Sequence, residues 1–376
     1  MHSTCRSRSA RSESGRYHGR ASLGRHSPPS PLGSGRSAGA LAQAEGRPYW
    51  MLLVCLVMAA PAVAQSPTLL VVNKAENSLA VLDPAGGKVL GRVPTGDGPH
   101  EIALSSDGRT AFVTNYGAQT PGSSLSVIDV TAGKETRRVD LGALRRPHGI
   151  IVSQGFVYFT AESNRVLVRY DPAANALDWL MGTGEAGTHM VVAAPDGSAL
   201  YTANIGSDSV TAFTRNQPGQ GGPGGQAGQA WTVTRIPVGR GPEGIDVSPD
   251  GREVWAAHLQ DGGVSVIDAS TKKVVQVIDI GTKRSNRLRF TPDGRLVLVS
   301  DLEAGTLVII DRAARKEVKR LALGKAPSGI LVVPDGSRAY VALTGENVLA
   351  VVDLKTLESV GRIPTGAGPD GMAWRQ

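Results

Sequence analysis

The sequence predicts an all-β protein, a seven-bladed β-propeller whose blades are four-stranded antiparallel sheets. Three observations predict this fold: an Asp-Gly landmark that recurs, alternating apolar runs around each landmark, and a last copy that stops after its first strand. The landmark glycines are Gly108, Gly197, Gly251, Gly294 and Gly336, with Gly155 of Ser153-Gln154-Gly155 in the same slot, and most steps between them are close to about 42 residues. A repeat of that length with four short strands is typical of a propeller blade.

The most regular copy of the repeat runs from Gly241 to Asp268. It contains an alternating apolar run, the Asp250-Gly251 pair, a second run, a Gly-rich loop and a third run that ends in Val-Ile-Asp. Alternation with a period of two residues is what a half-buried strand requires, and Asp-Gly supplies the positive φ angles of a tight hairpin. This copy is therefore predicted to contain three antiparallel strands.

The first 64 residues differ in composition from the rest of the chain. Residues 1–47 are rich in Ser, Gly and Arg and lack apolar periodicity, so we expect them to be disordered or to reflect a mis-assigned start. Residues 48–64 contain a short apolar run that ends in an Ala-Val-Ala triplet, which predicts a secretory signal peptide cleaved near Ala64. The mature chain, 65–376, is expected to be periplasmic or secreted and to contain no transmembrane segment.

Removal of this leader changes the charge and the cysteine content. The whole chain has 40 Lys and Arg and 33 Asp and Glu, but the leader holds eight arginines and two glutamates, which leaves 32 basic and 31 acidic residues. A nearly neutral domain does not favour nucleic acid as a partner. Both cysteines, Cys5 and Cys55, lie in the leader, so we expect no disulfide, thiolate nucleophile or Cys-based metal site in the mature chain.

Seven inner strands are expected, one at the start of each copy. They lie within residues 98–104, 146–152, 187–193, 241–247, 285–290, 326–332 and 368–374. The last copy has only this strand, whereas the mature N-terminus opens in mid-blade with residues 68–83 and 88–96. The N-terminal strands are therefore predicted to complete the C-terminal blade, which removes free sheet edges. The Gly-, Pro- and Gln-rich residues 216–230 are expected to form a flexible surface insertion.

Short sequence segments in the repeats resemble those of a known family. They are LLVVN at 69–73, AFVTN at 111–115, VYFTAE at 157–162, LYTAN at 200–204, and SVID at 126–129 and 265–268. These segments are similar to the YVTN-type β-propeller repeat, which occurs in secreted and periplasmic bacterial proteins, including YncE-like proteins. The resemblance covers residues 68–376 and implies a seven-bladed propeller of the kind that also builds lactonase-like proteins. It leaves the chemistry open, because a fold alone does not determine function.

One side chain from each blade is expected at the mouth of the central channel, the usual ligand site of such a fold. Alignment of the inner strands places there His100, His148, His189, Glu243, Asn286, Ser328 and Asp370. The three histidines and Glu243 lie on consecutive blades and form a donor set that suits zinc, copper, nickel or iron, so a divalent transition metal is one predicted ligand. A polar site without metal, and histidines that bond only to neighbouring blades, are the alternatives.

Basic residues cluster in the loops that lead to the same mouth. They are Arg145, Arg146, Arg240, Lys283, Arg284 and Lys325. On a nearly neutral domain, a ring of cations focuses positive potential onto an anion, so these residues predict a small anionic ligand; solvated loop charges are the alternative. Tyr116 and His258, at or near second-strand ends, are expected at the same opening.

Two functions of different class remain open. The first is a binding or interaction protein, expected to be a monomer, that holds a small anionic ligand or a protein partner without turnover. The second is a metal-dependent lactonase or lyase in which His148 or His189 acts as the general base. The sequence has no phosphate-loop, zinc-helix or nucleophile-elbow motif, and it assigns no pair of base and nucleophile. This favours the binding protein.

Overall fold

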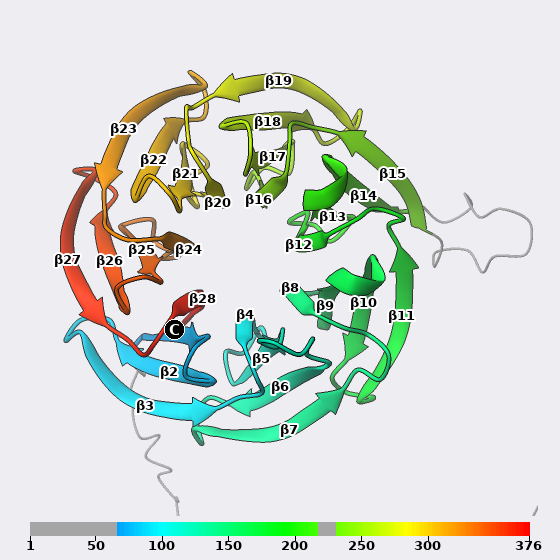
Figure 1. Cartoon of the computed structure of the whole chain (residues 1–376), viewed down its shortest axis with the longest axis vertical. Helices are drawn as coiled ribbons and strands as arrows, with labels where there is room; N and C mark the ends of the chain where they lie inside the picture. Colours follow the sequence, from blue (N-terminus) through cyan, green and yellow to red (C-terminus); the bar gives the residue numbers. More distant parts are fainter. Residues whose placement is uncertain (1–65, 217–230) are drawn as a thin grey trace, which may run out of the picture. The chain divides into compact units, whose positions relative to one another are not determined.

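The structure is a computed structural model that describes residues 66–216 and 231–376. The described residues form seven four-stranded antiparallel sheets arranged as the blades of a propeller, which confirms the predicted fold (Figure 1). The expectations for residues 1–47, for the signal peptide at 48–64 and for insertion residues 217–230 lie outside the described residues. No helix within the described ranges is long and apolar enough to cross a membrane.

Each blade runs from an inner strand beside the channel to an outer strand at the rim. Blade 1 consists of β28 (Pro369–Arg375), β1 (Thr68–Asn73), β2 (Ser78–Asp83) and β3 (Lys88–Pro94). Blade 2 consists of β4 (Pro99–Leu104), β5 (Thr110–Asn115), β6 (Ser124–Asp129) and β7 (Lys134–Asp140). Blade 3 consists of β8 (Pro147–Ser153), β9 (Phe156–Ala161), β10 (Val166–Asp171) and β11 (Ala176–Gly182), with the 3₁₀ turn η1 (Glu162–Asn164) after β9.

The remaining four blades repeat this order. Blade 4 consists of β12 (Thr188–Ala193), β13 (Ala199–Asn204), the 3₁₀ turn η2 (Ile205–Ser207), β14 (Ser209–Arg215) and β15 (Trp231–Pro237). Blade 5 consists of β16 (Pro242–Val247), β17 (Glu253–His258), β18 (Gly263–Asp268) and β19 (Lys273–Asp279). Blade 6 consists of β20 (Ser285–Phe290), β21 (Leu296–Asp301), β22 (Thr306–Asp311) and β23 (Lys316–Ala322). Blade 7 consists of β24 (Pro327–Val332), β25 (Arg338–Leu343), β26 (Val348–Asp353) and β27 (Glu358–Pro364).

Burial of a strand depends on its place in the blade. Second and third strands such as β17 and β18 are buried along nearly their whole length, because neighbouring blades pack on both of their faces. Outer strands are mostly exposed, and Val275 and Val277 of β19 face solvent. The core therefore consists of apolar layers between successive blades, such as the layer that contains Tyr201 of blade 4 and Ile245 of blade 5.

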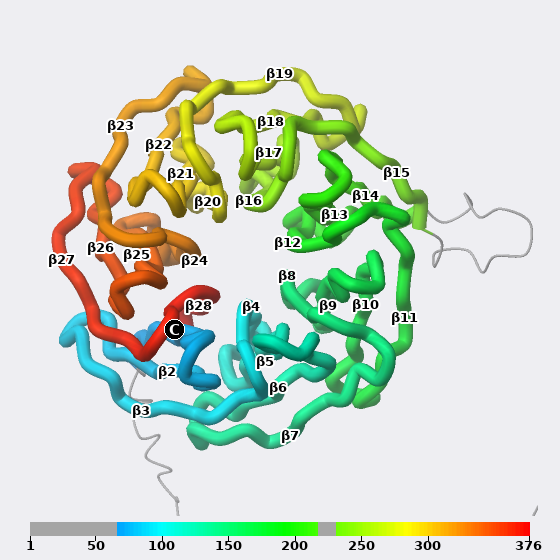
Figure 2. Tube along the Cα trace, in the orientation of Figure 1, coloured from blue at the N-terminus to red at the C-terminus, as the bar shows by residue number. Residues whose placement is uncertain are grey.

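Blade 1 closes the ring by joining the two ends of the described chain. β28 pairs with β1 in antiparallel register, with Leu69 opposite Trp374 and Leu70 opposite Ala373. Figure 2 shows the red C-terminal strand beside the blue N-terminal one. The predicted closure is confirmed, because β1 has β28 on one side and β2 on the other and is not left as a free edge.

Four inner strands need a glycine at their third position because adjacent blades pack closely there. A Cβ added at Gly149 of β8 would lie 2.7 Å from the Cα of Met190 in the next blade, a distance that backbone atoms cannot accommodate without a shift. The equivalent glycines of the other three strands are Gly244, Gly329 and Gly371. The same position in β4, β12 and β20 holds Glu101, Met190 and Arg287. Blades 2, 4 and 6 therefore place a side chain where the others have none.

Candidate functional site

Hydroxyl side chains of second strands hold the residues that face the channel. The hydroxyl of Thr114 on β5 accepts from the backbone N–H of Glu101 at 3.1 Å and donates to the carbonyl of His148 in the next blade at 2.8 Å. Thr160 on β9 makes the equivalent bond to the carbonyl of His189 at 2.6 Å. The second strands of blades 2 and 3 are thus bonded to the inner strands of the next blades, β8 and β12. In both cases the accepting carbonyl belongs to a histidine predicted to face the channel mouth.

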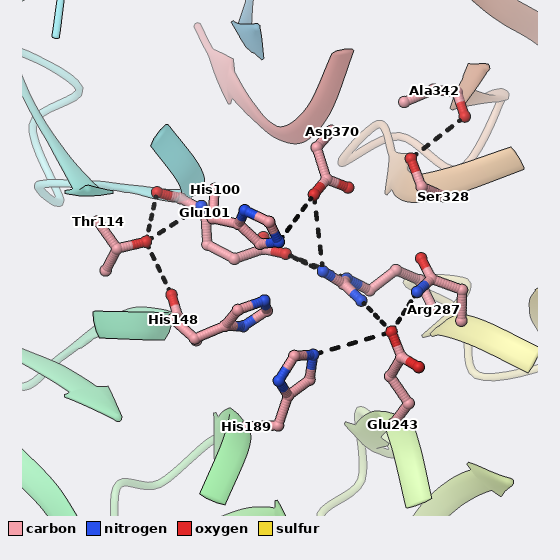
Figure 3. A network of polar contacts seen from close by, with 12 residues as sticks. His100, Glu101, Thr114, His148, His189, Glu243, Arg287, Ser328, Ala342 and Asp370 are labelled. Atoms are coloured by element: carbon pink, nitrogen blue, oxygen red, sulfur yellow. Dashed lines mark hydrogen bonds and ion pairs between the residues drawn. The ribbon is translucent and has the colours of Figure 1, made fainter. Parts of the chain in front are cut away.

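Five ring residues lie in one continuous group (Figure 3). The imidazoles of His148 and His189 stack with their centroids 3.6 Å apart, and His100 meets His148 edge-on at 4.4 Å. At one end of this row, Nε2 of His100 lies 3.7 Å from Oδ2 of Asp370. At the other end, Nε2 of His189 lies 3.8 Å from Oε1 of Glu243. Five blades therefore bring together residues that are far apart in the sequence.

The two other ring positions differ from each other. The hydroxyl of Ser328 shares a hydrogen bond of 2.6 Å with the hydroxyl of Thr344, so it is already engaged. The side-chain amide of Asn286 donates to Oε1 of Glu243, and this bond sets the orientation of the amide because the opposite assignment would place two oxygens together. Oδ1 of Asn286 is then a buried acceptor without a partner among the described residues.

A buried arginine lies at the centre of the ring. Nε of Arg287 donates to Oε1 of Glu101 at 3.1 Å, and its terminal nitrogens lie 3.4 Å from Glu243 and 3.9 Å from Asp370. Burial alone would lower the pKa of Arg287, but the surrounding carboxylates, Glu101 first, raise it above its ordinary value. Three carboxylates around one guanidinium make Arg287 the fixed charge centre of the site.

Asp370 on β28 is a buried carboxylate with one engaged oxygen. Nζ of Lys74 lies 3.0 Å from its Oδ2. Burial raises the pKa of Asp370, but Lys74, followed by Arg287 and His100, lowers it well below the ordinary value, so the group is ionised. Its second oxygen, Oδ1, is buried and has no partner in the described part of the chain.

His148 is fully buried, and neither of its ring nitrogens has a hydrogen-bond partner among the described residues. Burial, and then the neighbouring His189 and His100, lowers the pKa of His148 well below its ordinary value. Burial also lowers the pKa of His100. Burial lowers the pKa of His189 too, but hydrogen bonds with Glu162 and Glu243 outweigh it and raise that pKa. The row thus contains two neutral imidazoles and one that favours protonation.

Tyr116, Arg146 and Glu162 form the outer side of the group. The ring of Tyr116 stacks on His100 with centroids 4.9 Å apart, and Cζ of Arg146 lies 4.6 Å from the centre of the Tyr116 ring. The hydroxyl of Tyr116 donates to Oε2 of Glu162 at 3.2 Å, and Nδ1 of His189 lies 3.2 Å from the same oxygen. Burial and then the charge of Glu162 raise the pKa of Tyr116 to about 12, so its hydroxyl stays a donor.

Unpartnered polar atoms are concentrated on the ring. Within the described residues, four of the six buried side-chain atoms without a hydrogen-bond partner are Nδ1 and Nε2 of His148, Oδ1 of Asn286 and Oδ1 of Asp370. A buried polar atom without a partner costs about 1–3 kcal/mol, so stability of the fold does not account for this concentration. All four atoms are buried, so a ligand that bonds to them must displace neighbouring side chains.

Three predicted ligand residues are engaged elsewhere or face solvent. His258 is buried with Nδ1 2.7 Å from Asp261 and Nε2 2.9 Å from Ser265, so one ring nitrogen holds the loop after β17 and the other bonds to β18. Arg240 and Arg284 are exposed in the loops that precede β16 and β20. The prediction for His258 differs from the structure for a local reason. A polar side chain at the end of a second strand bonds first to the turn beside it.

Four members of the group were not predicted from the sequence. They are Lys74, Glu101, Glu162 and Arg287. Glu101 and Arg287 occupy the position at which four other inner strands have glycine, and this departure was the available signal. Lys74 and Glu162 follow the second strands β1 and β9 among other polar loop residues, where the copies carry no comparable signal.

The described residues contain no group of three or more His, Cys, Asp or Glu side chains placed to hold one metal ion. His148 and His189 stack nearly face to face, at 28°. Two imidazoles that bind one tetrahedral ion instead point their nitrogens at a common centre. The predicted set of His100, His148, His189 and Glu243 would therefore need ring rotations before it held a metal, and metal binding stays a prediction.

No family model and no curated protein matched the sequence. Among solved structures, the chain is similar to a putative 6-phosphogluconolactonase from Bacteroides uniformis, with 16% identity, a TM-score of 0.68 and coverage of 83% of this chain and 100% of that one. It is similar to the periplasmic gluconolactonase of Pseudomonas aeruginosa at 21% identity, with a TM-score of 0.66 and coverage of 82% and 99%. It is also similar to hydrazine synthase of Kuenenia stuttgartiensis at 22% identity, with a TM-score of 0.58 and coverage of 73% and 88%. At these identities the similarity shows the fold alone.

Proposed function

We propose that the mature chain is a periplasmic or secreted propeller of YVTN-type repeats whose channel-mouth ring binds a small ligand with an anionic group. The observation that supports a ligand at this ring is the concentration of unpartnered buried polar atoms on His148, Asn286 and Asp370. Its anionic group is supported by the cations Arg146 and Lys74. Each such atom costs about 1–3 kcal/mol in the unliganded fold. A ligand that bonds to them recovers part of this free energy, which favours binding at the ring over binding elsewhere.

Two cations are placed to receive the anionic group. The guanidinium of Arg146 lies over Tyr116, and the ammonium of Lys74 lies 3.0 Å from Asp370. Arg287 contributes less, because three carboxylates already surround it. We therefore expect the anionic group on the outer side of the ring, near Arg146. Carboxylates neutralise the charge of Arg146 less than they neutralise the charges of Lys74 and Arg287.

A thermal-shift screen of the mature chain against carboxylates, phosphates and sulfonates tests the proposal, with titration calorimetry on each hit. We expect at least one anion to stabilise the fold. Arg146→Gln is expected to weaken its binding by about tenfold or more, because a charge-assisted hydrogen bond contributes about 1.5–3 kcal/mol. Arg284→Gln removes a solvent-facing loop cation and is the matched control. The proposal fails if both variants bind every hit as tightly as the unaltered chain.

A second candidate function is that of a metal-dependent lactonase or lyase. The observation that favours it is the unpartnered imidazole of His148, whose lowered pKa keeps it neutral, as a general base must be before it accepts a proton. His189, oriented by Glu162, is the alternative base. The similar structures include proteins described as a 6-phosphogluconolactonase and a gluconolactonase, although that likeness supports the fold and not the chemistry.

Hydrolysis assays on a lactone panel, with and without chelator, separate the two candidates. Chelator-sensitive turnover that is lost in His148→Ala would favour the enzyme, whereas anion binding without turnover would favour the binding protein. Elemental analysis of untagged protein tests the metal directly. Equal metal content in the unaltered chain and in a variant with both His148→Ala and His189→Ala would rule out a metal held by these residues.

Localisation and assembly are tested on protein recovered from the periplasm or the medium. N-terminal sequencing is expected to begin near Gln65, after the predicted cleavage at Ala64. Detection of residues 1–47 on the mature chain would contradict a leader that is removed. Light scattering is expected to show a monomer, and a stable oligomer or a co-purified chain would indicate a protein partner instead.

A further inference from the structure

The ring divides into two arcs with different chemistry (Figure 3). The aromatic arc consists of His100, His148 and His189 with Tyr116 beside them. The acceptor arc consists of Glu243, Asn286, Ser328 and Asp370, from blades 5, 6, 7 and 1, and Figure 3 shows Asp370 and Glu243 on two sides of the Arg287 guanidinium. A ligand held at the ring therefore meets π faces on one side and carboxylate and amide oxygens on the other.

The acceptor arc has more acceptor atoms than the protein satisfies. Oδ1 of Asn286 and Oδ1 of Asp370 are both buried and have no partner within the described residues. Asn286 cannot turn its NH₂ group toward a ligand without losing its bond to Glu243. Asp370 is ionised and so has no proton to donate. A ligand group that satisfies both atoms must therefore be a hydrogen-bond donor.

Glu243 is the carboxylate of the group with the weakest pairing to a cation. Three of the four carboxylates in the group have a cation of their own, in the pairs Glu101–Arg287, Asp370–Lys74 and Glu162–His189. Glu243 has only shared partners, Arg287 at 3.4 Å and His189 at 3.8 Å. Because these charges are buried and weakly screened, a further positive charge beside Glu243 is favourable.

From these observations we propose that the ligand carries an ammonium group, which binds Asn286 and Asp370 on the acceptor arc while its anionic group lies near Arg146. This inference rests on the proposed function, since it concerns the same site, and it makes the ligand a small zwitterion, an amino-carboxylate with its two charges held apart. An ammonium has three donors, which suffice for the two unpartnered oxygens and for Glu243. A hydroxyl has one donor and no charge, so it satisfies only one of them.

A matched series of straight-chain acids tests the inference by titration calorimetry on the mature chain at neutral pH. Each chain length, from that of glycine to that of 6-aminohexanoate, is offered with a terminal ammonium, a terminal hydroxyl or a terminal methyl group. At one length or more, the ammonium form is expected to bind about tenfold or more tightly than the methyl form, with the hydroxyl form between them.

Asn286→Leu removes the amide oxygen while keeping a side chain of similar size. We expect this variant to lose the preference for the ammonium form and to retain the weaker binding of the methyl form. Arg284→Gln, two residues away on an exposed loop, is the control and should keep the full preference. Thermal melting followed by circular dichroism tests whether both variants are folded. If Asn286→Leu does not fold, the acid series on the unaltered chain decides whether the ligand carries an ammonium group.

The outcomes separate this inference from the proposed function. Methyl acids that bind as tightly as ammonium acids at every length would overturn the ammonium site and leave the anion site in place. Plain alkylamines that bind as tightly as amino acids of the same length would support the ammonium site and overturn the anionic half of the proposed function. If no acid of any form binds, the amino-carboxylate proposal fails, and the phosphates and sulfonates of the thermal-shift screen decide the proposed function.

Discussion

At the residue scale, the site is defined by departures from the repeat. Glu101 and Arg287 stand where four other inner strands have glycine, and their side chains form a buried ion pair across 186 positions of sequence. Alignment of the copies predicted which positions face the channel. It did not predict this pair, because the loss of a glycine shows that a side chain is present but not which side chain it meets.

Replacement of Arg287 by Met is expected to destabilise the fold by about 3–5 kcal/mol, because it leaves the carboxylates of Glu101, Glu243 and Asp370 buried without their shared cation. Arg289→Met is the matched control on the same strand. Arg289 lies 3.9 Å from Asp246 in a partly exposed pair, so its loss should cost about 1 kcal/mol or less. Chemical unfolding measures both, and equal effects would contradict a central role for Arg287.

Replacement of His148 by Gln is expected to reduce the loss of stability in acid. Burial holds the pKa of folded His148 well below its unfolded value of about 6.5, so the unfolded chain binds a proton that the folded chain does not. The stability from neutral His148 is therefore present above about pH 6.5 and is lost as pH falls through the folded pKa, by at most about 1.4 kcal/mol per pH unit. Urea unfolding at a series of pH values measures the slope.

His189 provides the control of opposite sign for this measurement. Its folded pKa is raised, so its contribution to stability is present below the unfolded pKa of about 6.5 and is lost as pH rises through the folded pKa. His189→Gln should therefore remove a loss of stability above about pH 6.5, whereas His148→Gln removes a loss below it. If the free energy of unfolding has the same slope against pH in the unaltered chain and in His148→Gln, the pKa of His148 does not differ between the folded and the unfolded chain.

At the scale of the element, the inner strands determine how closely the blades approach. Thr114 ties β4 to β8, Thr160 ties β8 to β12, and Gly149 lets the backbones of β8 and β12 meet. Alternation predicted these strands because a period of two is a local property of the sequence. The hydroxyl ties were not predicted, since they join residues of different blades through backbone carbonyls.

Replacement of Gly149 by Ala is expected to destabilise the propeller by about 1–3 kcal/mol, because the new Cβ would lie 2.7 Å from the backbone of Met190 and would push blades 3 and 4 apart. Gly182→Ala on the outer strand of the same blade is the control, because a Cβ there meets no atom within 4 Å. It should be neutral or slightly stabilising. Thermal unfolding compares the two, and a Gly149→Ala variant as stable as Gly182→Ala would contradict close packing of the inner strands.

At the scale of the whole molecule, closure of the ring and construction of the site depend on the same blade. β28 pairs with β1, and it also carries Asp370, while Lys74 directly follows β1. The two ends of the described chain thus supply both partners of one ion pair at the ring. The sequence predicted this closure, because the last copy has one strand and the first repeat-like residues, 68–83, open in mid-blade.

Removal of residues 368–376 is expected to prevent formation of the native propeller. β1 would lose its partner and expose a strand edge, with Leu69 and Leu70 no longer buried against β28, and such edges promote association between chains. Size-exclusion chromatography and far-ultraviolet circular dichroism detect the change. Deletion of Gln376 alone is the control and should be folded and monomeric. A monomeric truncated chain that melts at the temperature of the unaltered protein would contradict this dependence.

The sequence by itself determined the number of blades, the strands in each blade, the closure and the positions that form the ring. These features follow from period, alternation and turn residues, all of which act within a few tens of residues. Only the tertiary structure decided that Arg287 turns inward to three carboxylates while Arg240 and Arg284 face solvent. The direction of a charged side chain depends on partners from distant blades, and no local pattern records them.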